Sequence, residues 1–197
     1  MEIYREEDAD LFSAFLASDA EQPGKRRSIL TVPPLYTMQK EYLLKMLERR
    51  SLDPAAKDRI LQHAEAERTR IEKILSGAAV VEDEISVFME EEFALTPPRL
   101  PLVFDFIDEE IIYSREEYLA HLTQTRDFAK DHAAYRVTET NTRGFCNLQI
   151  TMLEGKWAMV SKNNAPAIHF VIRHPKLRAA IEKYIPPLAD RDGDKLL

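Results

Sequence analysis

The sequence predicts an α+β protein, with a helical N-terminal part followed by a mostly antiparallel sheet with packed helices. Apolar residues recur at helical spacing through much of the first 77 residues. A β-hairpin pattern occupies residues 145–162, with alternating side chains on both sides of a glycine-containing turn. With 197 residues, of which 45% are hydrophobic, the chain is long enough to bury a core around these elements.

The N-terminal region is predicted to hold three helices. The first spans about residues 7–17 and the second about residues 37–50, each with one apolar stripe. Asp53 suits the N-cap and Pro54 the first helical position, so a third helix is expected from there to Gly77. Its length and charged outer face make it the best candidate for a dimer contact, and a helix lying across its own domain is equally compatible.

Two stretches of this region are interpreted as connections. Residues 22–28 carry a basic cluster and resemble a polar loop, and Pro33-Pro34 limits residues 29–36 to an extended or edge segment. Acidic residues followed by prolines between residues 78 and 100 indicate a linker, with a boundary near Pro97. The predicted organisation is a mainly helical region with a possible dimer contact (1–97), an α+β sensor-like domain (98–188) and a flexible tail (189–197).

The C-terminal region is predicted to hold five or six strands and two helices. Ser114 and Glu117 form a capping box, so a helix is expected from there to about Asp131. Another helix should begin at Pro175. The expected strands are residues 102–107, 110–113, 135–140, the two arms of the hairpin and 167–173.

The hairpin register decides which of its side chains share a face. A two-residue turn at Glu154-Gly155 pairs Met152 with Trp157. This register predicts one apolar face that buries Trp157 and a second, mixed face on which Asn147 and other polar residues lie.

A ligand site is predicted where that second face meets the last strand. His169 and Arg173 share one face of the last strand, and donors would converge on one concavity if the two faces coincide. Such a concavity suits a small acidic or polar ligand. The alternative is the solvated side of an antiparallel sheet. The candidate ligand-binding residues are Asn147, Gln149, Lys162, His169 and Arg173.

Composition excludes several functions. The 27 basic and 34 acidic residues give a net charge of −7, which argues against a main surface that meets nucleic acid. A single cysteine, Cys146, excludes an internal disulfide, and no two histidines have helical metal-pair spacing, so neither a metal nor a cofactor is predicted. The chain has no signal peptide pattern and no apolar run of the roughly 18 residues that a membrane span needs, which predicts a cytoplasmic protein.

No catalytic residue is predicted either. His174-Pro175-Lys176 matches the His-x-Lys core of phospholipase D-type motifs, but Ile181 occupies the position of the acidic residue. The chain also lacks glycine-rich phosphate loops and the Gly-x-Ser-x-Gly motif. We therefore expect a protein that is not an enzyme. A small hydrolase that uses His169 or His174 and a pure protein-interaction module stay open as alternatives.

Residues 145–150, 154–162 and 165–178, together with residues 30–36, resemble a region that follows the helix-turn-helix domain of bacterial transcriptional regulators. The resemblance covers about residues 30–188. It implies a regulatory region, without DNA-reading residues of its own, that senses a small-molecule effector or mediates self-association as a homodimer. DNA would be read by a separate domain, which is not evident in this chain.

Overall fold

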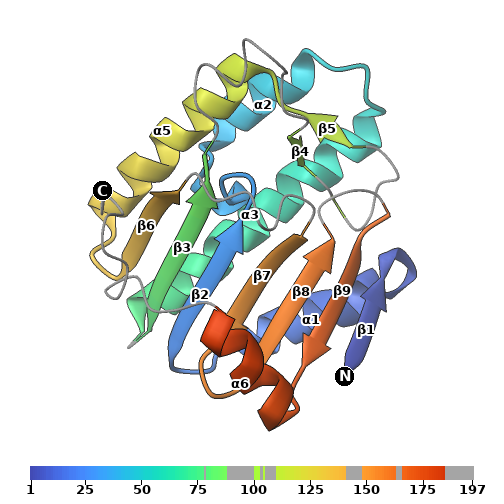
Figure 1. The fold of residues 1–197 in the computed structure, drawn as a ribbon. Coiled ribbons are helices and arrows are strands. Elements are labelled where there is room, and N and C mark those ends of the chain that lie inside the picture. Colours follow the sequence, from blue (N-terminus) through green and yellow to red (C-terminus); the bar gives the residue numbers. More distant parts are fainter. Residues whose placement is uncertain are drawn as a thin grey trace.

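One mixed sheet with helices on both faces organises the protein (Figure 1). The computed structural model describes residues 1–77, 79–87, 100–102, 104, 110–140, 148–162 and 166–184. The strands of the sheet are β1 (Glu2–Arg5), β2 (Lys25–Leu30), β3 (Val80–Ser86), β6 (Tyr135–Thr140), β7 (Leu148–Leu153), β8 (Trp157–Lys162) and β9 (Ile168–Ile172). Their order across the sheet is β1-β9-β8-β7-β2-β3-β6. Two further strands, β4 (Pro101–Leu102) and β5 (Ile111–Ile112), pair with each other.

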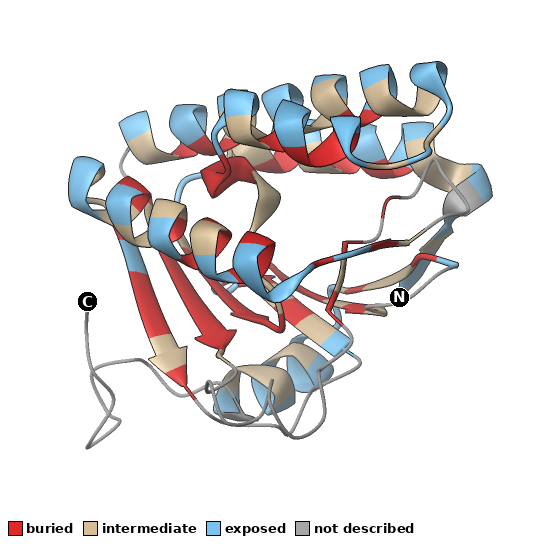
Figure 2. Cartoon of the chain, turned by 90° about the horizontal axis from the view of Figure 1, so that it is seen from above, coloured by how far each residue is buried: buried red, intermediate tan, exposed pale blue. Residues whose placement is uncertain are grey.

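The helices cover the two faces of the sheet unequally (Figure 2). They are α1 (Ala9–Ala20), α2 (Lys40–Glu48), α3 (Pro54–Ser76), α5 (Arg115–Asp131) and α6 (Pro175–Tyr184), with short 3-10 helices at Glu6–Asp8 and Leu35–Thr37. Buried side chains place α1, α2, α3 and α5 on one face, and Ile181 of α6 packs on the other. Within the described parts of the chain, no helix is long and apolar enough to cross a membrane.

The predicted α+β class is confirmed, and four of the six strand pairs in the main sheet are antiparallel. The pairs β2/β3 and β3/β6 are parallel. The described residues before the predicted boundary thus contribute strands β1, β2 and β3 as well as helices, and β2 and β3 lie between β7 and β6. Strands from before and after the predicted boundary therefore share one sheet. Pro97 itself and the predicted tail at residues 189–197 lie outside the described residues.

Two charged stretches form central strands, contrary to their interpretation as a loop and a linker. Arg26 lies in β2, where it is buried and paired with Asp19. Asp83 lies in β3, where it is fully buried and accepts hydrogen bonds from Tyr36 and Tyr135. The predictions were wrong because charge was taken as a sign of solvation, whereas these charges have partners inside the fold.

The prediction of an edge segment near Pro33-Pro34 was wrong for a simpler reason. Strand β2 ends at Leu30, before the prolines, so they do not interrupt its hydrogen bonds to either neighbour. The starts of α3 and α5, in contrast, agree with those predicted from the sequence. Asp53 caps α3 by accepting a hydrogen bond from the Ala56 amide at 3.2 Å, and the Ser114 capping box starts α5.

The hairpin register differs from the prediction by one residue. Leu153 pairs with Trp157 across a three-residue connection, and Gly155 within it has a φ of 72°. Because side chains alternate along a strand, this slip moves Trp157 to the face of Gln149 and Thr151. The indole is nonetheless buried as predicted, with 1% of its surface exposed, because α1 covers that face.

Two apolar clusters lie side by side on the face that carries α1, α2, α3 and α5. The larger one joins α2, α3 and α5 to β2, β3 and β6. The smaller one joins Phe12 and Phe15 of α1 to β7, β8 and β9. The two clusters are centred on different strands, and the helical layer is incompletely filled between α1 and α3.

Candidate functional site

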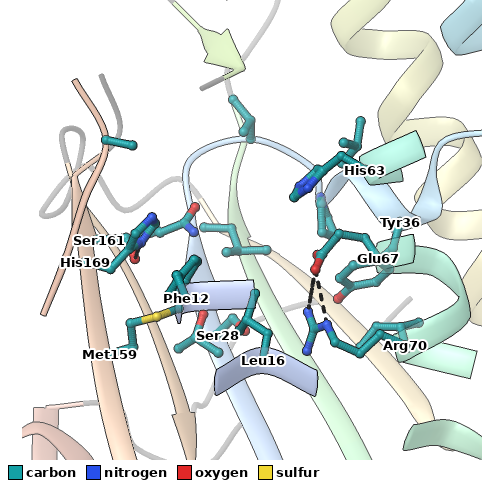
Figure 3. A pocket seen from close by; sticks show the side chains of 18 of the residues that line it. Phe12, Leu16, Ser28, Tyr36, His63, Glu67, Arg70, Met159, Ser161 and His169 are labelled. Atoms are coloured by element: carbon teal, nitrogen blue, oxygen red, sulfur yellow. Dashed lines mark hydrogen bonds and ion pairs between the residues drawn. The ribbon is translucent and has the colours of Figure 1, made fainter. Parts of the chain in front are cut away.

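A cavity of about 230 Å³ lies between α1 and α3, above β2, β7, β8 and β9 (Figure 3). Figure 3 shows it bounded on one side by Met159, Ser161 and His169 and on the other by His63, Glu67 and Arg70. Phe12 and Leu16 of α1 supply apolar wall between these sides. The cavity therefore has a sheet for a floor and helices for walls.

The floor of the cavity is polar, although it lies on the helix-covered face of the sheet. Ser28 is paired in register with Thr151, and Gln149 with Ser161, so their side chains are neighbours on adjacent strands. Within the described residues, the Thr151 hydroxyl and the Gln149 amide hydrogen bond to no other residue. Half-buried polar groups of this kind remain available to a ligand or to water.

Arg26 of β2 lines the cavity at the edge of the floor and is almost fully buried, with 3% of its surface exposed. Its Nε donates to Asp19 Oδ2 at 3.2 Å, and its Nη2 donates to the main-chain oxygens of Asp19 and Gln22 at 2.7 and 2.9 Å. The Trp157 indole donates to Asp19 Oδ1 at 3.0 Å. These bonds hold the guanidinium in place, while its Nη1 has no hydrogen-bond partner among the described residues.

In the α3 wall lies a second arginine, Arg70, that is also paired with a carboxylate. The Arg70 Nε donates to Glu67 Oε1 at 3.1 Å, and Nη2 donates to Oε2 at 3.2 Å. Burial lowers the pKa of Arg70, but the neighbouring Glu67 raises it by more, so the pKa lies above its ordinary value. Arg70 therefore keeps its positive charge in this wall.

Beside the floor, on the same face of the sheet, lies a buried carboxylate, Asp83 of β3, which is paired in register with Ser28. Burial raises its pKa above the ordinary value, while hydrogen bonds from Tyr36, Tyr135 and Ser28 oppose this effect. Burial first, and then the Asp83 charge, raises the pKa of both tyrosines well above 10. The tyrosines therefore remain hydrogen-bond donors to Asp83, and this group fixes the Ser28 side of the floor.

Ser161 and His169 form a hydroxyl–imidazole pair at the other end of the floor. Ser161 Oγ and His169 Nδ1 share a hydrogen bond of 2.8 Å. The imidazole stacks on the Phe12 ring, with the ring centres 4.0 Å apart and the planes inclined by 7°. These contacts fix the orientation of the imidazole at the cavity surface.

Three of the five predicted ligand-binding residues line the cavity: Gln149, Lys162 and His169. Arg173 does not line it. Its Nε donates to Glu2 at 2.8 Å, and its guanidinium lies 5.4 Å from the centre of the Phe15 ring. Asn147 lies outside the described residues.

Sequence reasoning missed the polar groups that β2 and α3 contribute, of which Arg26 is the most deeply buried. Residues 25–30 do carry a strand pattern. Arg26, Ser28 and Leu30 are spaced two apart, as residues on one face of a strand are, and the last two residues of the stretch are apolar. Asp19 lies in the last turn of an amphipathic helix, and nothing in the sequence indicated that it would pair with Arg26. Among the described residues, no group of three His, Cys, Asp or Glu side chains could hold a metal ion.

Comparison with known proteins gives little further information. No protein-family model and no curated protein matches the chain. Among solved structures, the chain is similar to TrmBL2, described as an archaeal chromatin protein with a novel mode of DNA binding. The likeness has a TM-score of 0.44 and 6% identity, and it covers 93% of this chain and 49% of that one. The chain thus spans about half the length of TrmBL2, and a likeness this distant does not identify its function.

Proposed function

We propose that this chain is a small-molecule-binding domain that serves as the regulatory part of a transcription regulator. The observation that supports binding is the cavity between α1 and α3, with an apolar wall from α1 and a floor that contains unpaired polar groups. Small-molecule sites typically combine apolar lining with a few placed polar groups. The regulatory role is supported by the sequence resemblance to regions downstream of helix-turn-helix domains.

The position of the cavity suggests how a ligand would act. A molecule bound there would touch both α1 and α3, which are packed on the sheet through separate apolar clusters. If one arrangement of these helices binds the ligand better, binding shifts the population toward that arrangement. A separate DNA-reading domain would respond to that shift.

A homodimer is part of this proposal. The apolar stripe of α3, including Ile60, Ile71 and Ile74, is buried inside the protein. A dimer contact through α3 would therefore use its charged outer face, where Arg68 and Glu72 form a surface ion pair at 3.1 Å. Such pairs contribute little to stability, so a contact of this kind would be weak and sensitive to salt.

A thermal-shift screen of the purified chain against a metabolite library tests the proposal, with the mass in solution measured in parallel. A ligand at 100 times its Kd should stabilise the fold by about 2.7 kcal/mol. Thr151→Phe places a ring in the cavity and should abolish the shift. Thr123→Phe makes the same change at an exposed position of α5 and should preserve it. Equal shifts in both variants would contradict binding in the cavity.

A second candidate function, hydrolysis of a small ester, is favoured by the 2.8 Å bond between Ser161 Oγ and His169 Nδ1. The hydroxyl would attack the ester carbonyl carbon while Nδ1 takes its proton, and the alcohol would leave with that proton. Water would then release the acid from Ser161. We prefer the binding function because Ser161 is only 1% exposed. Covalent labelling by a fluorophosphonate in the native chain, and its loss in Ser161→Ala, would favour the hydrolase instead.

A further inference from the structure

We propose that the cavity takes a small monocarboxylate, whose carboxylate group binds the unpaired side of the Arg26 guanidinium. This inference rests on the proposed function, because it names the chemical class of the ligand for the same cavity. The contacts of Arg26, the charges around it and the composition of the lining support it separately.

The hydrogen bonds of Arg26 leave one part of the guanidinium unused. A guanidinium carries five N–H donors, and Nε and Nη2 already donate to Asp19 and Gln22. Nη1 lies buried without a partner among the described residues. An unpaired buried donor on a charged group is costly, and a carboxylate oxygen makes a stronger bond to it than a neutral acceptor does. Because the other nitrogens hold the group in place, Nη1 is preorganised for an incoming anion.

The charges of the lining favour a single negative charge on the ligand. Arg26 is paired with Asp19. Arg70 is paired with Glu67 in the α3 wall. Each pair is neutral, the first buried and the second half-buried, so a second negative charge on the ligand would face the carboxylates of Asp19 and Glu67 with no unpaired arginine to balance it. Lys162 adds one positive charge to the lining, at the opposite end of β8 from Trp157. A monocarboxylate is therefore favoured over a phosphate or a dicarboxylate.

The remaining lining residues indicate which groups the ligand carries besides its carboxylate. Phe12, Leu16 and Met159 offer apolar contact, whereas Thr151 and Gln149 offer a hydroxyl and an amide from the floor. A ligand with one apolar side and one hydroxyl or amide group matches both surfaces. The volume of about 230 Å³ lies below the range of roughly 300–1,000 Å³ for sites of drug-sized molecules, so the ligand is small.

The only tryptophan of the chain provides a direct reporter for this contact. The Trp157 indole N–H donates to the same Asp19 carboxylate that holds Arg26, so an anion at Nη1 should shift the indole signal in a ¹H–¹⁵N spectrum. The probes are lactate, 3-hydroxybutyrate and 4-hydroxybenzoate, each paired with its primary amide, and inorganic phosphate. We expect at least one acid to shift the signal saturably and to bind at least ten-fold more tightly than its amide and than phosphate.

Two variants separate the carboxylate contact from the polar floor. Arg26→Lys keeps a positive charge beside Asp19 but removes Nη1, and should weaken binding of the acid at least ten-fold without changing binding of the amide. Thr151→Val has nearly the same shape, removes a hydroxyl that has no partner among the described residues, and should weaken hydroxylated acids several-fold at an unchanged thermal midpoint. Thr123→Val on the exposed side of α5, where the hydroxyl donates to the Leu119 carbonyl oxygen of the same helix, is the control for the effect on ligand binding.

The outcomes distinguish this inference from the proposed function. If an acid and its amide bind equally, or if the metabolite screen yields only ligands without a carboxylate, the cavity binds small molecules but the class is wrong. If neither the probes nor the library bind, both proposals fail. The comparison of acid with amide uses the native chain, so it does not depend on whether Arg26→Lys folds.

Discussion

The stability of the fold should fall as the pH is lowered from about 6.5 toward 3, because His121 is buried in its neutral form. The ring is completely buried. Its Nε2 lies 3.1 Å from the Pro34 carbonyl oxygen and its Nδ1 lies 2.6 Å from Tyr113 Oη. A carbonyl only accepts, so Nε2 carries the proton and Nδ1 accepts from the tyrosine. Burial lowers the pKa of His121 from 6.5 to about 3.

The magnitude follows from proton linkage. Between about pH 6.5 and pH 3 the unfolded chain binds a proton at this histidine that the folded chain does not bind. The free energy of unfolding therefore rises with pH across this window, by about 1.4 kcal/mol per pH unit. The contribution is fully present above pH 6.5 and is lost as the pH falls, with a total on the order of 5 kcal/mol.

Urea unfolding at several pH values between 5 and 7.5 measures this contribution. His121→Gln cannot take up the proton, so its free energy of unfolding should change with pH less steeply than that of the native chain. The difference should reach about 2 kcal/mol between pH 6.5 and pH 5. His174→Gln, which replaces an exposed histidine, should keep the native slope. Equal slopes for His121→Gln and the native chain would refute the reasoning.

Two further predictions concern the turns and packing at the ends of β2, β7 and β8, and urea unfolding checks both. Gly24→Ala should cost about 3 kcal/mol, because Gly24 has a φ of 139° and a new Cβ would meet Leu153 Cδ1 at 2.9 Å. Gly155→Ala, with a φ of 72° and open space around it, should cost only about 1 kcal/mol, and the reverse order would contradict this account. Trp157→Phe removes the indole donor to the buried Asp19 carboxylate and should cost at least about 1.5–3 kcal/mol. A loss below about 0.5 kcal/mol would show that this bond does not matter.

The sequence predicted the helices well because their ends carry local signals. Asp53-Pro54 and the Ser114 capping box act through hydrogen bonds within one turn, and neither depends on the rest of the fold. The apolar stripe of α3 likewise repeats along a single element. Local signals of this kind can be read from one sequence without knowledge of tertiary contacts.

The central strands could not be predicted in the same way. The charges of Arg26 and Asp83 are tolerated in β2 and β3 because residues outside their own strands supply their partners, Asp19 of α1 for Arg26 and Tyr135 of β6 for Asp83. Asp83, for example, is held by Tyr135, which lies on the next strand of the sheet but 52 positions along the chain. Without those partners in view, a charged stretch looks solvated, and buried charge is the exception to the usual pattern.

The candidate site was predicted in part, and partly through an incorrect register. Gln149 and His169 lie on one face because alternation along β7 and β9 places them there. The one-residue slip at Gly155 also brought Ser161 to that face, which the two-residue turn had placed opposite. Arg26 could not be included, since its strand had been interpreted as a loop.

The most direct test of ligand binding in the cavity is to map the backbone amide shifts caused by the tightest ligand from the metabolite screen. The account predicts saturable shifts that are largest in β7 and β8 around Thr151 and Met159, and in the facing turns of α1 and α3. Loss of these shifts in Thr151→Phe, but not in Thr123→Phe, would place the ligand between the two helices. Saturable shifts confined to α5 or α6, with β7 and α3 unchanged, would contradict the central claim.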